Sequence, residues 1–274
     1  MPPQAHVSAP TMAALTDFLR RPLYRLYERR LLAEIATAPL PQHVGIILDG
    51  NRRHGRENGI TDPLQLYTPG ADKLDDVLDW CSDLAIPAVT LWVCSTDNLA
   101  RSPDQVSGIL ATVEAKLRAL TTDPRIHARR VRVDAIGRLD LLPPATLEAI
   151  AEAKQATQDY GNLLLTIAIG YGGREEIIDA VHALLSEHAN GCTPQELIAR
   201  ITPETLRQYL YMPHAPDPDL IIRTSGEIRL SGFLLWQSAY SEFYFTDIYW
   251  PNFRKIDLLR AIRSYQGRHR RFGR

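Results

Sequence analysis

The first stretch of this 274-residue sequence that could do chemistry is an apolar run, 44–48, that ends in a carboxylate. The polar and charged residues that follow the run are Asp49, Gly50, Asn51, Arg52 and Arg53. A glycine lets backbone amides approach a ligand, and the amides and dipole of a helix start favour a phosphate. Asp49 could then hold Mg²⁺, which prefers one or two carboxylates plus phosphate oxygens. The same pattern fits Asp49 as a helix N-cap, with Arg52 and Arg53 on a solvated face.

A second stretch places arginines directly after the apolar run 220–222. Arg223 follows this run, and Arg229 and Ser231 lie within the same loop, which also contains Gly226. Two guanidinium groups and a hydroxyl that converge on one point suit a diphosphate, because it offers many acceptor oxygens. An exposed turn with unrelated charges is the alternative. We favour phosphate binding, because Arg223 immediately follows a strand that is predicted to be buried.

Three further polar residues lie next to apolar segments. Glu242 lies between aromatic and apolar residues, where an unpaired carboxylate would be costly. Its partner is either a metal shared with a diphosphate or one of the many arginines. Ser95 and Asn98 follow the apolar run 88–94, at the sheet edge where Asp49 is also expected. Asn98 either orients a substrate or caps a helix.

Composition and missing motifs narrow the class of protein. Lys and Arg number 31 against 32 Asp and Glu, and this balance argues against a sequence-independent nucleic-acid binder. Three cysteines without a CxxC pair predict reduced thiols in a cytoplasmic protein. The sequence has no HExxH or GxSxG motif, which argues against a zinc hydrolase and a serine hydrolase. No run approaches the ~20 apolar residues that cross a bilayer, so we expect at most peripheral membrane contact.

The order of elements predicts a single-domain α/β fold with a mostly parallel sheet flanked by helices. Apolar runs predict strands at 44–48, 88–94, 131–136, 163–169, 220–222 and 243–246. Helical patterns predict helices at 14–37, 71–84, 104–120, 144–160, 173–188, 194–199, 203–209 and 230–240. We therefore expect a tail and helix over 1–37 and a catalytic domain over 38–274. In such sheets ligands bind outside the carboxyl ends of the strands.

Taken together, these motifs resemble the cis-prenyltransferase family, whose best-known member is undecaprenyl diphosphate synthase. The resemblance extends over residues 43–273. The matching elements lie at 49–53, 95–98, 217–231, 233–242 and 271–273. The stretch 22–31 is most similar to that of short-chain actinobacterial members that make cis-farnesyl diphosphate.

The resemblance implies an activity. It implies Mg²⁺-dependent condensation of an allylic diphosphate with isopentenyl diphosphate. The similarity to short-chain members implies a short Z-prenyl diphosphate of about C10–C15 as the product, with its hydrocarbon chain in an apolar tunnel. This tunnel would lie between the sheet and the helices, lined by Trp92, Val93 and the helix 104–120.

The resemblance also assigns roles to residues. Asp49 and Glu242 would hold Mg²⁺, and Asp49, Asn51 and Asn98 would position the reacting groups. The residues that would hold the allylic diphosphate are Gly50, Asn51, Arg52 and Arg53. The residues that would hold isopentenyl diphosphate are Arg223, Arg229 and Ser231, and Ser95 would also contact substrate. The tail residues Arg271 and Gly273 would reach the site of the partner subunit in a homodimer.

Departures from the family pattern cluster on the side of the allylic donor. His54 replaces the usual Trp, Leu66 and Tyr67 replace the usual Gly and His, and a usual Arg is absent. Two lost cationic contacts weaken donor binding by roughly several kcal/mol unless other residues replace them. Irregular coupling of the lavandulyl type, or cyclisation of a prenyl diphosphate, is therefore an alternative on the same fold. A non-catalytic partner subunit is less favoured, because such subunits lose the aspartate that is Asp49 here.

Overall fold

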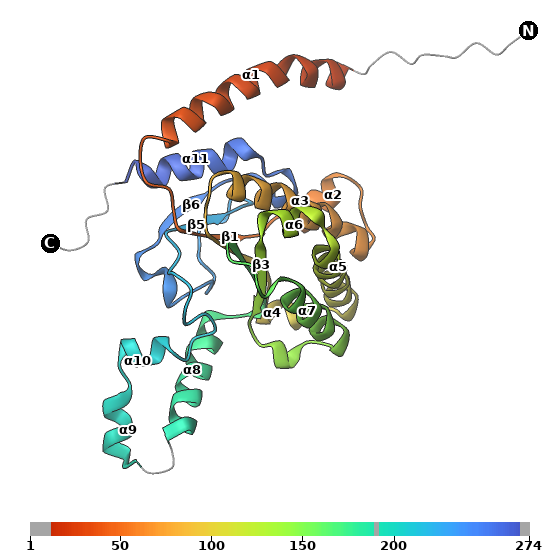
Figure 1. Ribbon diagram of the computed structural model, residues 1–274. Coiled ribbons are helices and arrows are strands. Elements are labelled where there is room, and N and C mark those ends of the chain that lie inside the picture. The colour runs from red at the N-terminus through yellow and green to blue at the C-terminus, as the bar shows by residue number, and fades with distance from the viewer. Residues whose placement is uncertain (1–11, 189–191, 269–274) are drawn as a thin grey trace, which may run out of the picture. The chain divides into compact units, whose positions relative to one another are not determined.

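The computed structural model describes residues 12–188 and 192–268, and Figure 1 shows its elements along the chain. The chain divides into two compact units. The larger unit, residues 40–253, holds the whole sheet, and the smaller unit holds helices α1 (Met12–Ile35) and α11 (Lys255–Gln266). Helix α11, which was expected within the catalytic domain, therefore groups with the N-terminal helix.

The larger unit is built on a six-stranded sheet in the order β3-β4-β2-β1-β5-β6. Every neighbouring pair of strands is parallel. The strands are β1 (His43–Ile47), β2 (Ala88–Ser95), β3 (Val131–Ile136), β4 (Leu163–Tyr171), β5 (Leu220–Arg223) and β6 (Glu242–Phe245). All residues of β1 and β5 are buried, as expected for strands covered on both faces of a parallel sheet. The predicted α/β fold with a mostly parallel sheet is confirmed.

Helices connect the strands from β1 to β5, whereas the crossover from β5 to β6 contains only the 3₁₀ turn η2. The α-helices of the larger unit are α2 (Asn51–Glu57), α3 (Pro63–Asp83), α4 (Thr96–Leu99), α5 (Pro103–Thr122), α6 (Pro124–Arg129), α7 (Pro144–Thr157), α8 (Gly173–His188), α9 (Pro194–Arg200) and α10 (Pro203–Arg207). Short 3₁₀ turns are η1 (Leu139–Leu141), η2 (Gln237–Tyr240) and η3 (Trp250–Asn252). Figure 1 shows α8, α9 and α10 extending away from the sheet. Proline in the first turn starts α3, α5 and α7, where its fixed φ suits the helix.

Two of the predicted helices differ from the observed ones. The helix expected at 71–84 begins earlier, at Pro63, because the Asp62 side chain accepts a hydrogen bond from the Leu64 backbone N–H and caps it. The helix expected at 230–240 is wrong. Ser231 and Leu234 adopt left-handed φ values of 55° and 45°, which end any helix, and only the 3₁₀ turn η2 remains.

Ion pairs connect α1 and α11 within the smaller unit. Lys255 pairs with Glu28 at 3.2 Å, and Arg263 pairs with Glu34 at 3.1 Å. Such partly exposed pairs are screened by solvent and contribute little stability by themselves. Fully buried apolar residues on the same helices, among them Leu31 of α1 and Ile262 of α11, also belong to this unit.

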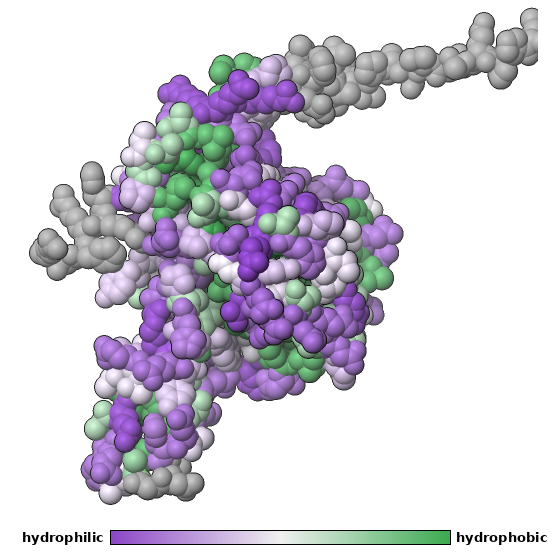
Figure 2. Space-filling model, in the orientation of Figure 1, coloured by the Kyte–Doolittle hydropathy of each residue, from purple (hydrophilic) through white to green (hydrophobic). Residues whose placement is uncertain are grey.

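The surface in view in Figure 2 is largely hydrophilic, with separate apolar areas. On α1, Leu23 and Leu26 are both 67% exposed. Single exposed apolar residues are common on folded proteins and need no partner to explain them. Within residues 12–188 and 192–268, no helix has the length and apolar character to cross a membrane.

A cluster of aromatic rings anchors the segment between β5 and β6 to the sheet. Trp92 of β2 stacks on Phe233, with ring centres 5.3 Å apart. Tyr171, at the end of β4, meets both rings edge-on at 6.5 and 6.2 Å. Phe233 and Tyr171 are fully buried, so this cluster fixes the irregular segment that sequence periodicity predicted to be helical.

A buried carboxylate beside this cluster ties α8 to the same segment. Glu176 accepts hydrogen bonds from the Tyr171 hydroxyl, and at 3.0 Å from both the Tyr211 backbone N–H and the Gln237 amide. Burial raises the pKa of Glu176, although these three donors favour the charged form. Glu176 is fully buried, so its protonation is coupled to folding.

We expect Glu176→Gln to change how stability depends on pH. Burial raises the pKa of Glu176 in the folded protein. The protonated group therefore contributes stability at pH values below the ordinary pKa of a glutamate, and this contribution is lost as the pH rises through the raised pKa. Urea unfolding between about pH 4 and pH 8 should therefore show a smaller fall in unfolding free energy for Glu176→Gln than for the wild type. The exposed Glu148→Gln is the matched control. Parallel curves for the wild type and Glu176→Gln would contradict this coupling.

Candidate functional site

A cavity of about 640 Å³ lies at the carboxyl ends of β1, β2 and β5. This is the edge where ligands bind in parallel α/β sheets, and the volume is that of a small-molecule site. The cavity is strongly basic, because six arginines line it: Arg52, Arg53, Arg56, Arg101, Arg223 and Arg229. The acidic lining residues are Asp49, Asp97 and Glu227. The predicted residues Gly50, Asn51, Ser95, Asn98 and Ser231 also line it.

Asp49 enters the cavity directly after β1. Its Oδ1 accepts a hydrogen bond from the Gly50 backbone N–H at 2.7 Å, and its backbone N–H donates to the Thr224 hydroxyl at 2.9 Å. Gly50, not Asp49, is the N-cap of α2, so the alternative of Asp49 as a helix cap is wrong. Gly50 has φ 103°, and an added Cβ would lie 2.8 Å from the Tyr249 ring and 3.0 Å from Ser225. Only glycine fits this turn.

Arg223 is a buried cation at the end of β5. Its side chain is only 6% exposed, and Nη2 donates to Asp49 Oδ2 at 3.0 Å. Nη1 donates to the Arg229 carbonyl at 2.6 Å and to the Ser231 hydroxyl at 2.7 Å. Its Nε is buried and has no partner among residues 12–188 and 192–268. A buried donor left unpaired costs free energy, which favours a ligand oxygen at this position.

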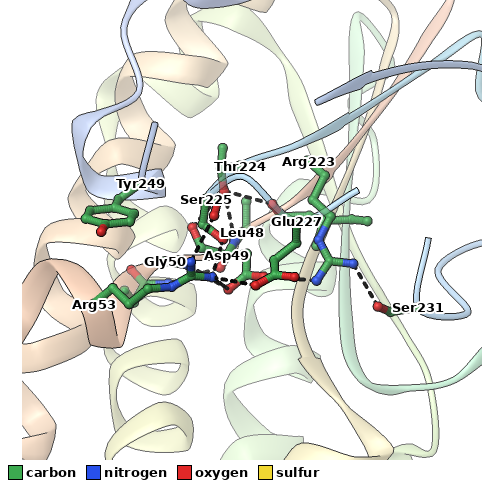
Figure 3. Close-up of polar contacts among 12 residues, drawn as sticks. Leu48, Asp49, Gly50, Arg53, Arg223, Thr224, Ser225, Glu227, Ser231 and Tyr249 are labelled. Carbon is green, nitrogen blue, oxygen red and sulfur yellow. Dashed lines mark hydrogen bonds and ion pairs between the residues drawn. The ribbon is translucent and has the colours of Figure 1, made fainter. Parts of the chain in front are cut away.

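Arg53 approaches Asp49 from the side opposite Arg223, as Figure 3 shows. Its guanidinium donates to the Ser225 carbonyl at 3.0 Å and to the Ser225 hydroxyl at 2.8 Å. It also pairs with Glu227 at 3.2 Å, and Glu227 in turn pairs with Arg229. Glu227, which the sequence patterns did not single out, therefore bridges the two arginines and lies between them.

The residues after β2 line the cavity while they build a short helix. The Ser95 hydroxyl accepts from the Asn98 backbone N–H at 3.1 Å, and Asn98 Oδ1 accepts from the Ser95 backbone N–H at 3.3 Å. This is a reciprocal cap on α4, so the capping role considered for Asn98 is observed. Ser95 and Asn98 also line the cavity, so both can contact a ligand bound there.

The sequence motifs also missed two arginines of the cavity, and they singled out Tyr67 only as a departure from the family pattern. Arg56 and Arg101 add cations, and Arg101 follows the Ser95–Asn98 element by only three residues. The Tyr67 hydroxyl is buried and lacks a partner within the structurally described part of the chain. Burial raises the pKa of Tyr67, and the nearby charges of Arg101 and Arg52 oppose that rise. An arginine-rich wall therefore faces the position where the family's usual Gly and His are replaced.

The structure does not bring Glu242 to Asp49. Glu242 begins β6 and pairs with Leu220, three residues before Arg223. Three residues along a strand span about 10 Å, so Glu242 lies toward the amino ends of the strands, whereas Asp49 follows the carboxyl end of β1. Glu242 does not line the cavity, so its predicted role as the second metal carboxylate has no support within one chain. Over residues 12–188 and 192–268, no group of three His, Cys, Asp or Glu could hold a metal by itself.

The predicted tail residues Arg271 and Gly273 lie outside the described residues. Their expected contact with a partner subunit therefore stays a prediction.

A second, apolar cavity of about 70 Å³ adjoins the basic one. Leu48, Asn51, Tyr67, Val93 and Ile109 line both cavities and form their junction. The apolar chamber then continues between the sheet and helices α3 and α5, as expected for Val93 and the helix 104–120. Trp92 does not line it, because alternate residues of a strand face opposite sides and Trp92 stacks on Phe233 instead. The two cavities together suit a ligand with an anionic head and an apolar tail.

Comparisons with known proteins agree with this geometry. Residues 47–273 match the family described as putative undecaprenyl diphosphate synthase. A (2Z,6E)-farnesyl diphosphate synthase from Thermobifida fusca is 52% identical over 256 residues, which cover 93% of this chain and 98% of the relative. A tritrans,polycis-undecaprenyl-diphosphate synthase (geranylgeranyl-diphosphate specific) from Methanopyrus kandleri is 51% identical over 255 residues, 93% of this chain and 92% of the relative.

A solved structure is similar as well. It is lavandulyl diphosphate synthase from Lavandula x intermedia in complex with dimethylallyl diphosphate, with a TM-score of 0.77 and 33% identity. The match covers 86% of this chain and 99% of that one.

We expect Arg101→Ala to weaken the binding of inorganic pyrophosphate. Hydrogen bonds to charged groups contribute about 1.5–3 kcal/mol, so the dissociation constant should rise about tenfold or more. Isothermal titration calorimetry at fixed ionic strength measures this change. The exposed Arg132→Ala on β3 removes an equal charge far from the cavity and should leave the affinity unchanged. An equal loss of pyrophosphate affinity in both variants would show that the affinity depends only on the net charge of the protein and not on Arg101 in the cavity.

Proposed function

This chain belongs to the undecaprenyl diphosphate synthase family of prenyltransferases, and on that premise we propose that it condenses an allylic diphosphate with isopentenyl diphosphate to a short-chain Z-prenyl diphosphate. The observation that carries this proposal is the pairing of two cavities. A basic cavity lined by Asp49 adjoins a small apolar chamber and shares five lining residues with it. A prenyl diphosphate has the matching chemistry, because its head is a polyanion and its tail is a hydrocarbon.

The diphosphate of isopentenyl diphosphate is assigned to the loop after β5. Arg223 Nε is the unpaired buried donor there, and the Ser231 hydroxyl and Arg229 flank it. Planar guanidinium groups match the spacing of phosphate oxygens. Because Glu227 pairs with Arg229 and Arg53, an arriving diphosphate would compete with this carboxylate for both arginines.

The allylic diphosphate is assigned to the other half of the basic cavity. Gly50, Asn51, Arg52 and Arg53 surround that half, as the resemblance implies. Arg101 and the Tyr67 hydroxyl supply polar contacts in the region where the family's usual Arg and His are missing. We propose that these groups compensate for the lost donor contacts.

Asp49 fits a divalent cation that is shared with a substrate. It is the carboxylate at the centre of the basic cavity, its side chain is 32% exposed, and Mg²⁺ usually needs only one or two carboxylates besides substrate phosphates. Mg²⁺ bound there would neutralise charge that builds on the departing diphosphate. Arg52, Arg53 and Arg101 would stabilise the same charge through fixed guanidinium groups.

The apolar chamber would protect the reaction from water. The bond between the allylic carbon and its diphosphate breaks, a carbon–carbon bond forms to the alkene of isopentenyl diphosphate, and a proton then leaves the neighbouring carbon. Water at the allylic cation would give an alcohol instead, so a closed apolar wall is needed. We assign the proton to the departing diphosphate, which lies in the same cavity.

The small volume of the apolar chamber supports a short product. About 70 Å³ is far below the roughly 300–1,000 Å³ of ordinary ligand sites. The name of the Thermobifida fusca relative, a (2Z,6E)-farnesyl diphosphate synthase, agrees with a short chain.

We further propose that the enzyme acts as a cytoplasmic homodimer whose C-terminal tails complete each other's sites.

Irregular coupling is the second candidate function. The replacements at Leu66 and Tyr67 and the structural similarity to lavandulyl diphosphate synthase favour it. The two reactions differ in their products. Purified protein should be incubated with Mg²⁺, isopentenyl diphosphate and, in turn, dimethylallyl, geranyl and farnesyl diphosphate, and the dephosphorylated products identified by gas chromatography–mass spectrometry. We expect linear cis-prenols, whereas a branched product formed from dimethylallyl diphosphate alone would establish irregular coupling.

We expect Asp49→Asn to abolish pyrophosphate release. The substitution keeps the size of the side chain but removes the charge that faces Arg223 and that would hold the cation. Loss of such electrostatic stabilisation costs about a hundredfold or more in rate. A coupled pyrophosphate assay measures this, and the exposed Asp104→Asn on α5 is the control. Turnover by Asp49→Asn at the wild-type rate, with an unchanged melting temperature, would reject the assigned role.

A further inference from the structure

We propose that the ion pair between Lys116 and Asp75 closes the far end of the apolar chamber and limits the length of the prenyl chain. This inference rests on the proposed function, because it assigns the chamber to the product tail. Beyond that function, it names Lys116 and Asp75 as the residues that determine product length, and none of the sequence motifs includes either residue.

The lining residues show where the chamber ends. On α3 the lining runs from Tyr67, at the junction with the basic cavity, to Leu74. On α5 it runs from Ile109, also at the junction, to Lys116. Each path is seven residues of helix, which is about 10 Å. The two helices therefore carry the chamber away from Asp49 over the same length and bring Lys116 to its far end.

Lys116 differs from the other residues at that end. Leu74, Leu91 and Leu117 are buried and apolar, whereas Lys116 is charged and its side chain is 14% exposed. A lysine commonly packs its methylene stem on apolar surface and keeps its ammonium group in a polar environment. Here the stem can line the chamber while the ammonium group closes it.

A carboxylate from the opposite helix holds that ammonium group. Lys116 Nζ lies 2.5 Å from Asp75 Oδ1, and Asp75 follows the lining residue Leu74 on α3. The pair therefore bridges α3 and α5 at the far end of the chamber. A longer hydrocarbon chain would have to separate the pair, and separating a partly buried ion pair is costly.

Asp75 is anchored from outside the chamber as well. Its Oδ2 lies 3.0 Å from Arg125 of α6, and Arg125 also pairs with Asp123 at 2.7 Å. This anchoring keeps the closing pair in place. It also means that removal of the lysine leaves Asp75 paired with Arg125, so the chain should still fold when Lys116 is truncated.

The test is the product distribution of Lys116→Ala. We expect products longer by at least one five-carbon unit, with the ratio of longer to shorter chains raised about tenfold or more, because newly opened apolar space favours extra methylene groups. Lys73→Ala is the matched control, since Lys73 also pairs with a carboxylate on α3, Asp76, but does not line the chamber. Lys116→Arg, which keeps the charge, should keep the wild-type length. An active Lys116→Ala enzyme with the wild-type product distribution would overturn the proposal.

A binding series separates this proposal from the proposed function. n-Alkyl diphosphates of increasing chain length are titrated into the wild type and Lys116→Ala by calorimetry. Affinity should stop rising at a shorter chain in the wild type than in the variant, and this result would support the closed end even if neither protein turns over substrate. Identical length dependence would refute it. If no alkyl diphosphate binds either protein, the proposed function fails and the closing role fails with it.

Discussion

The buried guanidinium of Arg223 is the constraint on which the site depends. The Arg223 side chain is only 6% exposed, so its positive charge needs a nearby negative charge to offset the cost of burial. Asp49, which follows the neighbouring strand β1, supplies this charge, with its Oδ2 3.0 Å from Arg223 Nη2. The parallel pairing of β1 and β5 brings these two residues together at one sheet edge. The remaining donors of Arg223 hold the Arg229 carbonyl and the Ser231 hydroxyl, so the same side chain fixes the loop that follows. One ion pair thus joins the two halves of the basic cavity.

The aromatic cluster of Trp92, Tyr171 and Phe233 holds the same loop from the opposite face of the sheet. Ser225, Gly226, Ser231 and Leu234 all adopt positive φ, so the loop is held in a conformation that a regular helix or strand cannot provide. Burial of Phe233 against Trp92 offsets that strain. The loop thereby holds Ser231 and Arg229 at the basic cavity, while Val93, on the other face of the same strand as Trp92, lines the apolar chamber.

Sequence patterns predicted the parts of this site that follow apolar strands. Asp49 and Arg223 were found because continuous apolar runs mark strands of a parallel sheet, and their ends meet at one edge. The place of Glu242 depends on the register between β5 and β6, which the apolar runs do not show, and within one chain this register keeps Glu242 away from Asp49. The loop between β5 and β6 was predicted as a helix because its apolar residues have helical spacing. Lys116 and Asp75 belong to predicted helices, but no pattern in either helix indicates that the two helices pack together there.

A crystal structure of the protein with Mg²⁺, isopentenyl diphosphate and a non-hydrolysable allylic thiodiphosphate tests the central claim most directly. The account predicts two separate diphosphates on either side of Asp49, with the metal ion bound to Asp49. One diphosphate should contact Arg223 Nε and Ser231, and the other should contact Arg53 and Arg101. A metal ion away from Asp49, or both diphosphates on the same side of it, would contradict the account.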